Sequence, residues 1–119
     1  MQHVILNHGA TVRPEVLFRS LGDPTRLRSL MLLLQEGELR VYELTEALGL
    51  SQPKISRHLA YLRGAGITEA RREGTWVFYR ISNGLPDWAR QVLHSTLDGN
   101  RRDKTFIADR NRLKSISLA

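Results

Sequence analysis

The chain has 119 residues, 41% of them hydrophobic and none of them cysteine, which is enough for one compact domain but excludes disulfides, thiolate nucleophiles and thiolate metal sites. The formal net charge of +6 indicates a polyanionic partner. No apolar run approaches the roughly 18 residues of a membrane span, and the N-terminus lacks the basic-then-apolar order of a signal peptide, so we expect a cytoplasmic protein.

The first predicted elements are helices. A short helix is predicted over 14–21, because Pro14 suits the first turn of a helix. Asp23 directly before Pro24 is a typical N-cap, and apolar residues at helical spacing then predict a core helix to about Glu36. These apolar residues are Leu27, Leu30, Met31, Leu33 and Leu34.

A helix-turn-helix is predicted next. The segment Val41 to Leu48 carries apolar residues on one face, which predicts a short helix. In the turn that follows, Gly49 is placed for a left-handed C-cap and Ser51 for the N-cap of a second helix, which runs to about Arg63. Two helices joined by a tight turn with a glycine form the helix-turn-helix arrangement.

The second of these helices, residues 51–63, has two different faces. Ile55, Leu59 and Leu62 recur at i, i+4 and i+7 and form one apolar stripe. The polar residues that lie largely off this stripe are Gln52, Lys54, Ser56, Arg57 and His58. One face can therefore be buried while the other reads a nucleic-acid groove.

A β-hairpin is predicted after this helix. Residues 67–72 and 76–81 are expected to be strands around the turn 73–75, because the second segment is rich in β-branched and aromatic residues. A hairpin directly after a recognition helix is a wing. Residues 85–97 then resume a helical period, and the basic tail 99–119 is either a frayed helix or disordered.

Positive charge is concentrated in two blocks. Residues 51–80 carry six bases against two acids, and residues 99–119 carry the same numbers, whereas the remaining segments are slightly acidic. A basic block can be an ordinary solvated surface. Here one block coincides with the amphipathic helix, which favours nucleic-acid binding.

The predicted fold is mainly α with a small β-hairpin, in a dimeric winged helix-turn-helix. The predicted organisation is a flexible N-terminal arm (1–13), a DNA-binding and dimerisation domain (14–98) and a basic C-terminal tail (99–119).

The element order and several motifs resemble the ArsR/SmtB family of winged-helix repressors. These motifs run in the family's order and are Leu21-Gly22-Asp23-Pro24-Thr25-Arg26-Leu27, Glu43-Leu44 with Leu48, Ser51-Gln52-Pro53-Lys54-Ile55-Ser56-Arg57-His58-Leu59 through Leu62-Arg63, and Gly74-Thr75-Trp76-Val77-Phe78-Tyr79-Arg80. The resemblance covers roughly residues 14–97 and is closest to the arsenic-responsive branch. It implies a transcriptional repressor that binds a palindromic operator in double-stranded DNA as a homodimer and is released by an inducer.

One departure from the resemblance changes the expected chemistry. Arsenic-responsive members of this kind carry Cys-Val-Cys at the start of the helix before the recognition helix, because thiolates capture soft trivalent arsenic. This chain has Arg40-Val41-Tyr42 there, so we expect no arsenite binding at this site. The inducer stays unidentified, and a repressor without an inducer is a second possibility.

No metal or cofactor site is predicted. A second kind of site in the family binds zinc through Asp and His residues on the last helix. Here Asp87 and His94 are seven residues apart, and the usual spacing of the ligands is missing. His3 and His8 offer only two imidazoles without a carboxylate or thiol. For His58, beside Arg57, a DNA contact is the favoured role.

The predicted mechanism places the two recognition helices of a dimer in successive major grooves, roughly 34 Å apart. Gln52 suits an adenine edge through its paired donor and acceptor, while Arg71 and Arg72 near the wing tip suit a minor groove or phosphates. The predicted DNA-binding residues are Ser51, Gln52, Lys54, Ser56, Arg57, His58, Arg63, Arg71 and Arg72.

Dimerisation is predicted through the first and last helices of the domain, whose apolar surface one small domain cannot fully cover. The predicted interface residues are Val16, Leu17, Leu21, Trp88, Val92 and Leu93.

A catalytic function is set aside, because the sequence contains no phosphate-binding glycine loop, catalytic carboxylate pair, nucleophile elbow or metal-binding His-Glu pattern. The alternative from another class is a winged helix that presents the same surface to a protein partner. It is disfavoured because residues 51–63 contain three permanently charged bases and no acid.

Overall fold

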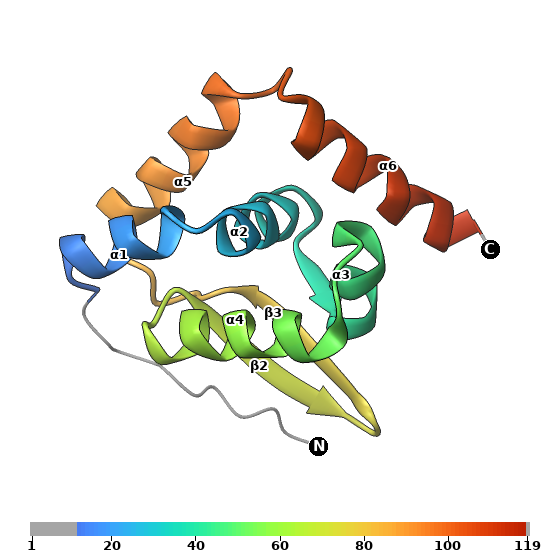
Figure 1. Ribbon diagram of the computed structural model, residues 1–119. Helices are drawn as coiled ribbons and strands as arrows, with labels where there is room; N and C mark the ends of the chain where they lie inside the picture. The colour runs from blue at the N-terminus through green and yellow to red at the C-terminus, as the bar shows by residue number, and fades with distance from the viewer. Residues whose placement is uncertain (1–11, 119) are drawn as a thin grey trace.

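The computed structural model describes residues 12–118, which form helices and a small sheet (Figure 1). The elements, in chain order, are α1 (Pro14–Leu21), α2 (Pro24–Glu36), β1 (Glu38–Arg40), α3 (Val41–Leu48), α4 (Gln52–Gly64), β2 (Thr68–Glu73), β3 (Trp76–Ile81), α5 (Asp87–Gly99) and α6 (Lys104–Leu118). The mainly α winged helix-turn-helix expected from the sequence is confirmed, with one strand more than expected.

Helix α2 lies at the centre because it is apolar on every side. The run Leu30–Leu33 is at most 1% exposed, and four consecutive residues point in all directions around a helix. All the other helices and β3 contact α2. In Figure 1, α5 and α6 form two arms above α2, and α4 and the sheet lie below it. The core is therefore covered by α5 and α6 on one side of α2, and by α4 and the sheet on the other side.

The sheet is antiparallel, with the strand order β1-β3-β2. The predicted hairpin is confirmed as β2 and β3, and Gly74 turns between them with a left-handed φ of 62°. Strand β1 was not expected, and it adds Glu38 opposite Arg80 and Arg40 opposite Phe78. Because Arg40 is also the N-cap of α3, this short strand joins the start of α3 directly to the wing.

The helix-turn-helix has the caps that the sequence predicts. Gly49 adopts a left-handed φ of 67° at the end of α3, a conformation that glycine takes without steric cost. The hydroxyl oxygen of Ser51 accepts a hydrogen bond from the backbone N–H of Lys54, 3.4 Å away, and so caps α4.

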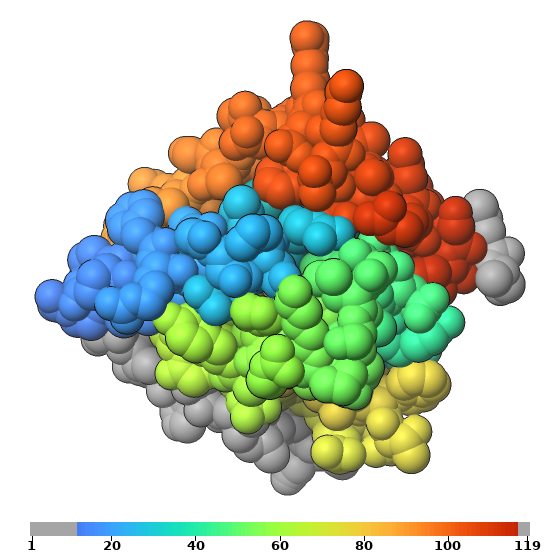
Figure 2. Space-filling model, viewed as in Figure 1, coloured from blue at the N-terminus to red at the C-terminus, as the bar shows by residue number. Residues whose placement is uncertain are grey.

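The basic tail is helical. Asp103 caps α6 by accepting from the backbone N–H groups of Thr105 and Phe106, at 2.9 and 3.1 Å. Helix α6 then packs on α2 and α3, and Figure 2 shows its surface lying against α3. No helix within residues 12–118 is both long and apolar enough to span a membrane.

Candidate nucleic-acid interface

Helix α4 has the two faces that its sequence predicts. Ile55, Leu59 and Leu62 are fully buried against the core. Gln52 and Arg57 are exposed, while the other predicted contacts Ser51, Lys54, Ser56, His58 and Arg63 range from exposed to half-buried. The helix is therefore anchored by one face and offers polar and cationic groups on another.

The exposed start of α4 carries a pre-arranged polar pair. The side-chain amide nitrogen of Gln52 donates to the hydroxyl of Ser56, one turn further along, at 2.6 Å. This bond holds the Gln52 amide near the helix surface, where a donor and an acceptor can meet a base edge together.

A groove of about 590 Å³ lies between α3, α4 and the wing. Gln52 and Ser56 line it from α4, and Arg72 lines it from the wing. Arg63 also lines it and donates to the hydroxyl of Tyr79 at 3.2 Å. The structure thus brings four of the predicted contacts to one concave surface, which sequence spacing alone did not place together.

Two exposed aromatic rings at this groove were not singled out from the sequence as contacts. Tyr42 at the start of α3 and Trp76 at the wing tip both line it. The guanidinium of Arg40 lies over the Trp76 ring at 4.7 Å from its centroid. These rings add apolar surface to a groove that Arg63, Arg72 and the acidic Glu46 also line.

Arg71 lies on the opposite face of the hairpin from Arg72, because successive strand residues point to opposite sides. Its guanidinium donates to Glu38 at 2.8 and 2.9 Å and to Glu73 at 2.7 Å, and it stacks over Phe78. The hydrogen bonds to these two carboxylates raise the pKa of Arg71 above its ordinary value. This side chain joins the strands of the sheet and does not reach the groove beside α4.

His58 faces the start of α2. Its Nδ1 lies 3.3 Å from the Nη1 of Arg26 and 3.8 Å from a carboxylate oxygen of Asp23. Arg26 also donates to the backbone oxygens of Ser20 and Arg19 at 3.1 and 3.0 Å, and it stacks over Tyr61. His58 therefore belongs to a contact between α1, α2 and α4, a role that its place in the recognition helix did not reveal.

Burial lowers the pKa of His58, and the positive charges of Arg26, Arg57 and Lys54 lower it further, while Asp23 opposes them. The folded state therefore favours neutral His58. As the pH falls below the ordinary histidine value of about 6.5, the unfolded chain binds this proton more readily than the folded one.

We expect the free energy of unfolding to decrease as the pH falls from about 7 to about 5, above the range in which carboxylates titrate. Urea unfolding at several pH values measures this, and in the variant His58→Gln the decrease should be smaller. An equal decrease in both proteins would contradict the role of His58.

The residues predicted for the dimer surface differ in their exposure. Trp88 on α5 is 39% exposed, and Phe18 on α1, which was not among the predicted residues, is 56% exposed. Leu17 and Leu93, by contrast, are fully buried in the protomer's own core, so their assignment to the interface was wrong. The other predicted residues, Val16, Leu21 and Val92, are half-buried, and Leu21 and Val92 pack against this core.

No metal site is found in the part of the chain that the structure describes, since no group of three His, Asp or Glu side chains gathers there. His94 is exposed on α5. Arg40, which stands where arsenic-responsive members carry a cysteine, donates a hydrogen bond to Glu43 at 3.3 Å and stacks on Trp76. His3 and His8 lie outside the described residues.

Comparison with known proteins identifies relatives of the whole helix-turn-helix. Residues 23–69, from the start of α2 into β2, match the family described as bacterial regulatory protein, arsR family. The chain is 52% identical over 88 residues to the arsenic resistance transcriptional regulator ArsR1 of Pseudomonas putida, covering 74% of this chain and 69% of the relative. It is 50% identical over 80 residues to the arsenical resistance operon repressor of Escherichia coli, covering 67% and 68%.

Solved structures agree with these sequence relatives. HlyU from Vibrio cholerae superposes with a TM-score of 0.64 at 34% identity, over 71% of this chain and 87% of that chain. The transcriptional repressor BigR from Xylella fastidiosa superposes with a TM-score of 0.62 at 33% identity, over 71% and 82%.

Proposed function

The chain belongs to the arsR family of bacterial regulatory proteins, and we propose that it is a cytoplasmic repressor that binds a palindromic operator in double-stranded DNA as a homodimer. Its relatives are transcriptional regulators, and it is not an enzyme. The single observation that carries the proposal is the exposed cationic face of α4 beside the groove of the wing.

In the proposed complex, α4 lies in the major groove with Gln52 and Ser56 at base edges. Lys54 and Arg57 divide between bases and phosphates, and Arg72 with Arg63 holds the DNA backbone at the groove beside the wing. Ser51 stands at the start of α4, where a helix N-terminus attracts phosphate. Arg71 and His58 are left out of this interface, because both side chains are engaged with other parts of the protein.

The proposed homodimer uses the exposed rings of Phe18 and Trp88 as its centre, with Val16, Leu21 and Val92 around them. Large exposed rings on a small soluble domain are a common sign of a protein interface. A two-fold axis between the α1 and α5 helices of two copies would set two α4 helices against one duplex, which is why the proposed operator is a palindrome.

The proposed inducer is not arsenite bound by thiolates, although relatives are named for arsenic resistance. The position where such thiolates would stand holds Arg40, whose guanidinium is bonded to Glu43 and stacked on Trp76. A cationic side chain cannot ligate a metal or metalloid cation. The identity of the inducer stays open in the proposal.

Selection from a randomised DNA duplex library, followed by mobility shifts at several salt concentrations, tests the function. We expect one palindrome to be recovered and its affinity to fall steeply with salt. The alternative, a winged helix that binds a protein, would be favoured if no duplex were retained even at low salt.

The variant Gln52→Ala is expected to lose discrimination at one base position of each half-site, by about 1 to 3 kcal/mol. The reason is the loss of the paired donor and acceptor at the exposed start of α4. Binding to a set of single-base operator variants measures it, and an unchanged preference at every position would count against Gln52 as a base reader.

A further inference from the structure

The basic C-terminal block folds back onto α2 and α3, and most of its arginines make ion pairs within the protein. Arg110 donates to Glu36 of α2 at 2.8 Å, and Arg101 donates to Asp98 at 2.7 Å. Much of the positive charge that marked this tail in the sequence is therefore paired with acids. These basic residues therefore make contacts within the protein, and their positive charge does not by itself indicate that they bind DNA.

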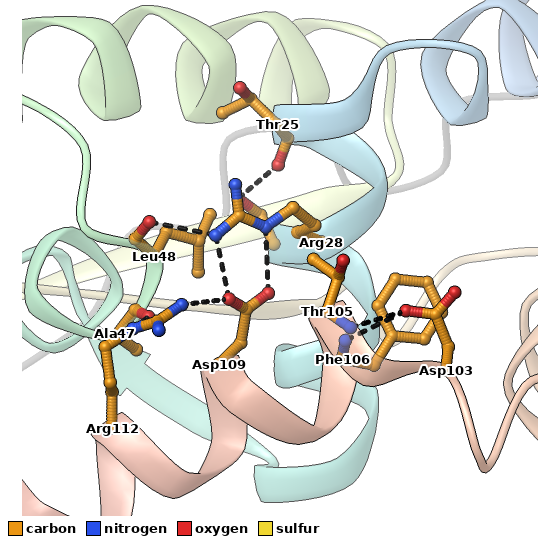
Figure 3. A network of polar contacts seen from close by, with 10 residues as sticks. Thr25, Arg28, Ala47, Leu48, Asp103, Thr105, Phe106, Asp109 and Arg112 are labelled. Atoms are coloured by element: carbon orange, nitrogen blue, oxygen red, sulfur yellow. Dashed lines mark hydrogen bonds and ion pairs between the residues drawn. The ribbon is translucent and has the colours of Figure 1, made fainter.

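A buried carboxylate organises the contact between α6 and the rest of the fold (Figure 3). Asp109 of α6 is 1% exposed. It accepts two hydrogen bonds from Arg28 of α2, at 2.7 and 2.9 Å, and one from Arg112 of α6 at 2.7 Å. A paired, charge-assisted arrangement of this kind fixes the orientation of both guanidinium groups.

Both arginines also reach the end of α3. The Nε of Arg112 donates to the backbone oxygen of Ala47 at 2.7 Å, and an Nη of Arg28 donates to the backbone oxygen of Leu48 at 2.9 Å. The last carbonyls of a helix lack partners within the helix and carry partial negative charge. Two cationic donors thus hold the last residues of α3, directly before the turn that leads into α4.

We propose that Arg112 is a positioning residue for DNA reading. By holding the Ala47 carbonyl it fixes the end of α3, the turn at Gly49 and hence the angle at which α4 meets the duplex. This inference rests on the proposed function. The other use of Arg112, a direct contact with phosphate, is an outcome that the experiment below separates from it.

Three variants of the full chain separate position from charge. Arg112→Ala removes both the donor and the charge. Arg112→Gln removes the charge but keeps an amide nitrogen at the same place along the side chain as the arginine Nε. Lys114→Ala is the matched control, because it removes one exposed charge from the same helix, two residues away.

Each variant is measured against the selected palindrome and against a scrambled duplex of equal length, at several salt concentrations. We expect Arg112→Ala to bind the palindrome roughly tenfold more weakly, as for loss of one hydrogen bond to a charged group, while its salt slope stays unchanged. Binding to the scrambled duplex should change by less than about twofold, because non-specific binding depends on charge and not on the angle of α4.

Arg112→Gln should keep most of the preference for the palindrome, and Lys114→Ala all of it. Circular dichroism checks that each variant is folded. If Arg112→Ala does not fold, Arg112→Lys replaces it, because lysine keeps the charge but places a methylene where the donor stood.

Equal losses for Arg112→Ala and Lys114→Ala on both duplexes, with a salt slope lower by about one, would assign Arg112 to phosphate contact and overturn the proposal. An unchanged palindrome affinity in a folded Arg112→Ala protein would overturn it as well. Failure of the unaltered protein to select any duplex would instead refute the proposed function.

Discussion

Replacing Arg57 with glutamate is expected to weaken operator binding by about a hundredfold or more at physiological salt. Arg57 is exposed on α4, on the face opposite the buried stripe of the helix. The substitution removes a contact worth roughly 1 to 3 kcal/mol and sets a negative charge against the phosphates. Fluorescence anisotropy with the selected palindrome at one fixed salt concentration measures the loss.

The matched control for this experiment is Arg102→Glu, which changes the net charge by the same amount. Arg102 is exposed in the connection between α5 and α6, which lies across α2 from α4 in Figure 1. Charges more than a Debye length, about 8 Å, from the DNA are largely screened, so this variant should bind almost normally. Equal weakening by the two variants would show that only net charge matters and that α4 does not lie in the groove.

Replacing Asp109 with asparagine is expected to lower the free energy of unfolding by about 3 to 5 kcal/mol. The carboxylate is almost fully buried, and the Arg28 side chain that it pairs with is only 18% exposed. Removing one partner leaves the buried guanidinium without its counter-charge, which costs far more than the loss of a surface ion pair. In the unaltered protein, hydrogen bonding to Asp109 raises the pKa of Arg28. Arginine keeps its proton in proteins even without such a partner, so Arg28 stays charged in the variant and the cost remains.

Urea unfolding followed by circular dichroism measures the change, and Asp98→Asn is the matched control. Asp98 forms the same kind of ion pair with Arg101, but both side chains are more than half exposed. An exposed pair contributes roughly 0 to 1 kcal/mol, so this variant should unfold almost as the unaltered protein does. Similar small losses in both variants would mean that α6 adds little to the stability of the fold.

Local signals were sufficient for most of the helices and for the wing. The caps at Asp23 and Ser51 and the left-handed glycine at residue 49 are determined within a few residues, so the sequence predicts where α2, α3 and α4 begin or end. Strand β1 has only three residues, too few to show an alternating pattern, and it exists because β3 offers it an edge. Helix α6 was left open because its apolar residues are scattered along a charged segment.

The predicted interfaces were less accurate. A periodic pattern shows which residues share a face of a helix, but it does not show whether the protein's own core or a partner covers that face. Leu17 and Leu93 lie on apolar stripes as expected, but the protomer's own core covers them. In the same way, Arg71 and His58 are polar residues whose partners Glu38 and Asp23 lie more than thirty positions away in the sequence. Contacts between residues so far apart in the sequence depend on tertiary packing and cannot be predicted from local residue spacing.

Strand β1 also gives the molecule a mechanical property. It pairs with β3 and runs without a break into α3, so it links the hairpin directly to the first turn of α3. The wing and the helix-turn-helix are therefore not independent parts, because a displacement of either one is passed to the other through this strand.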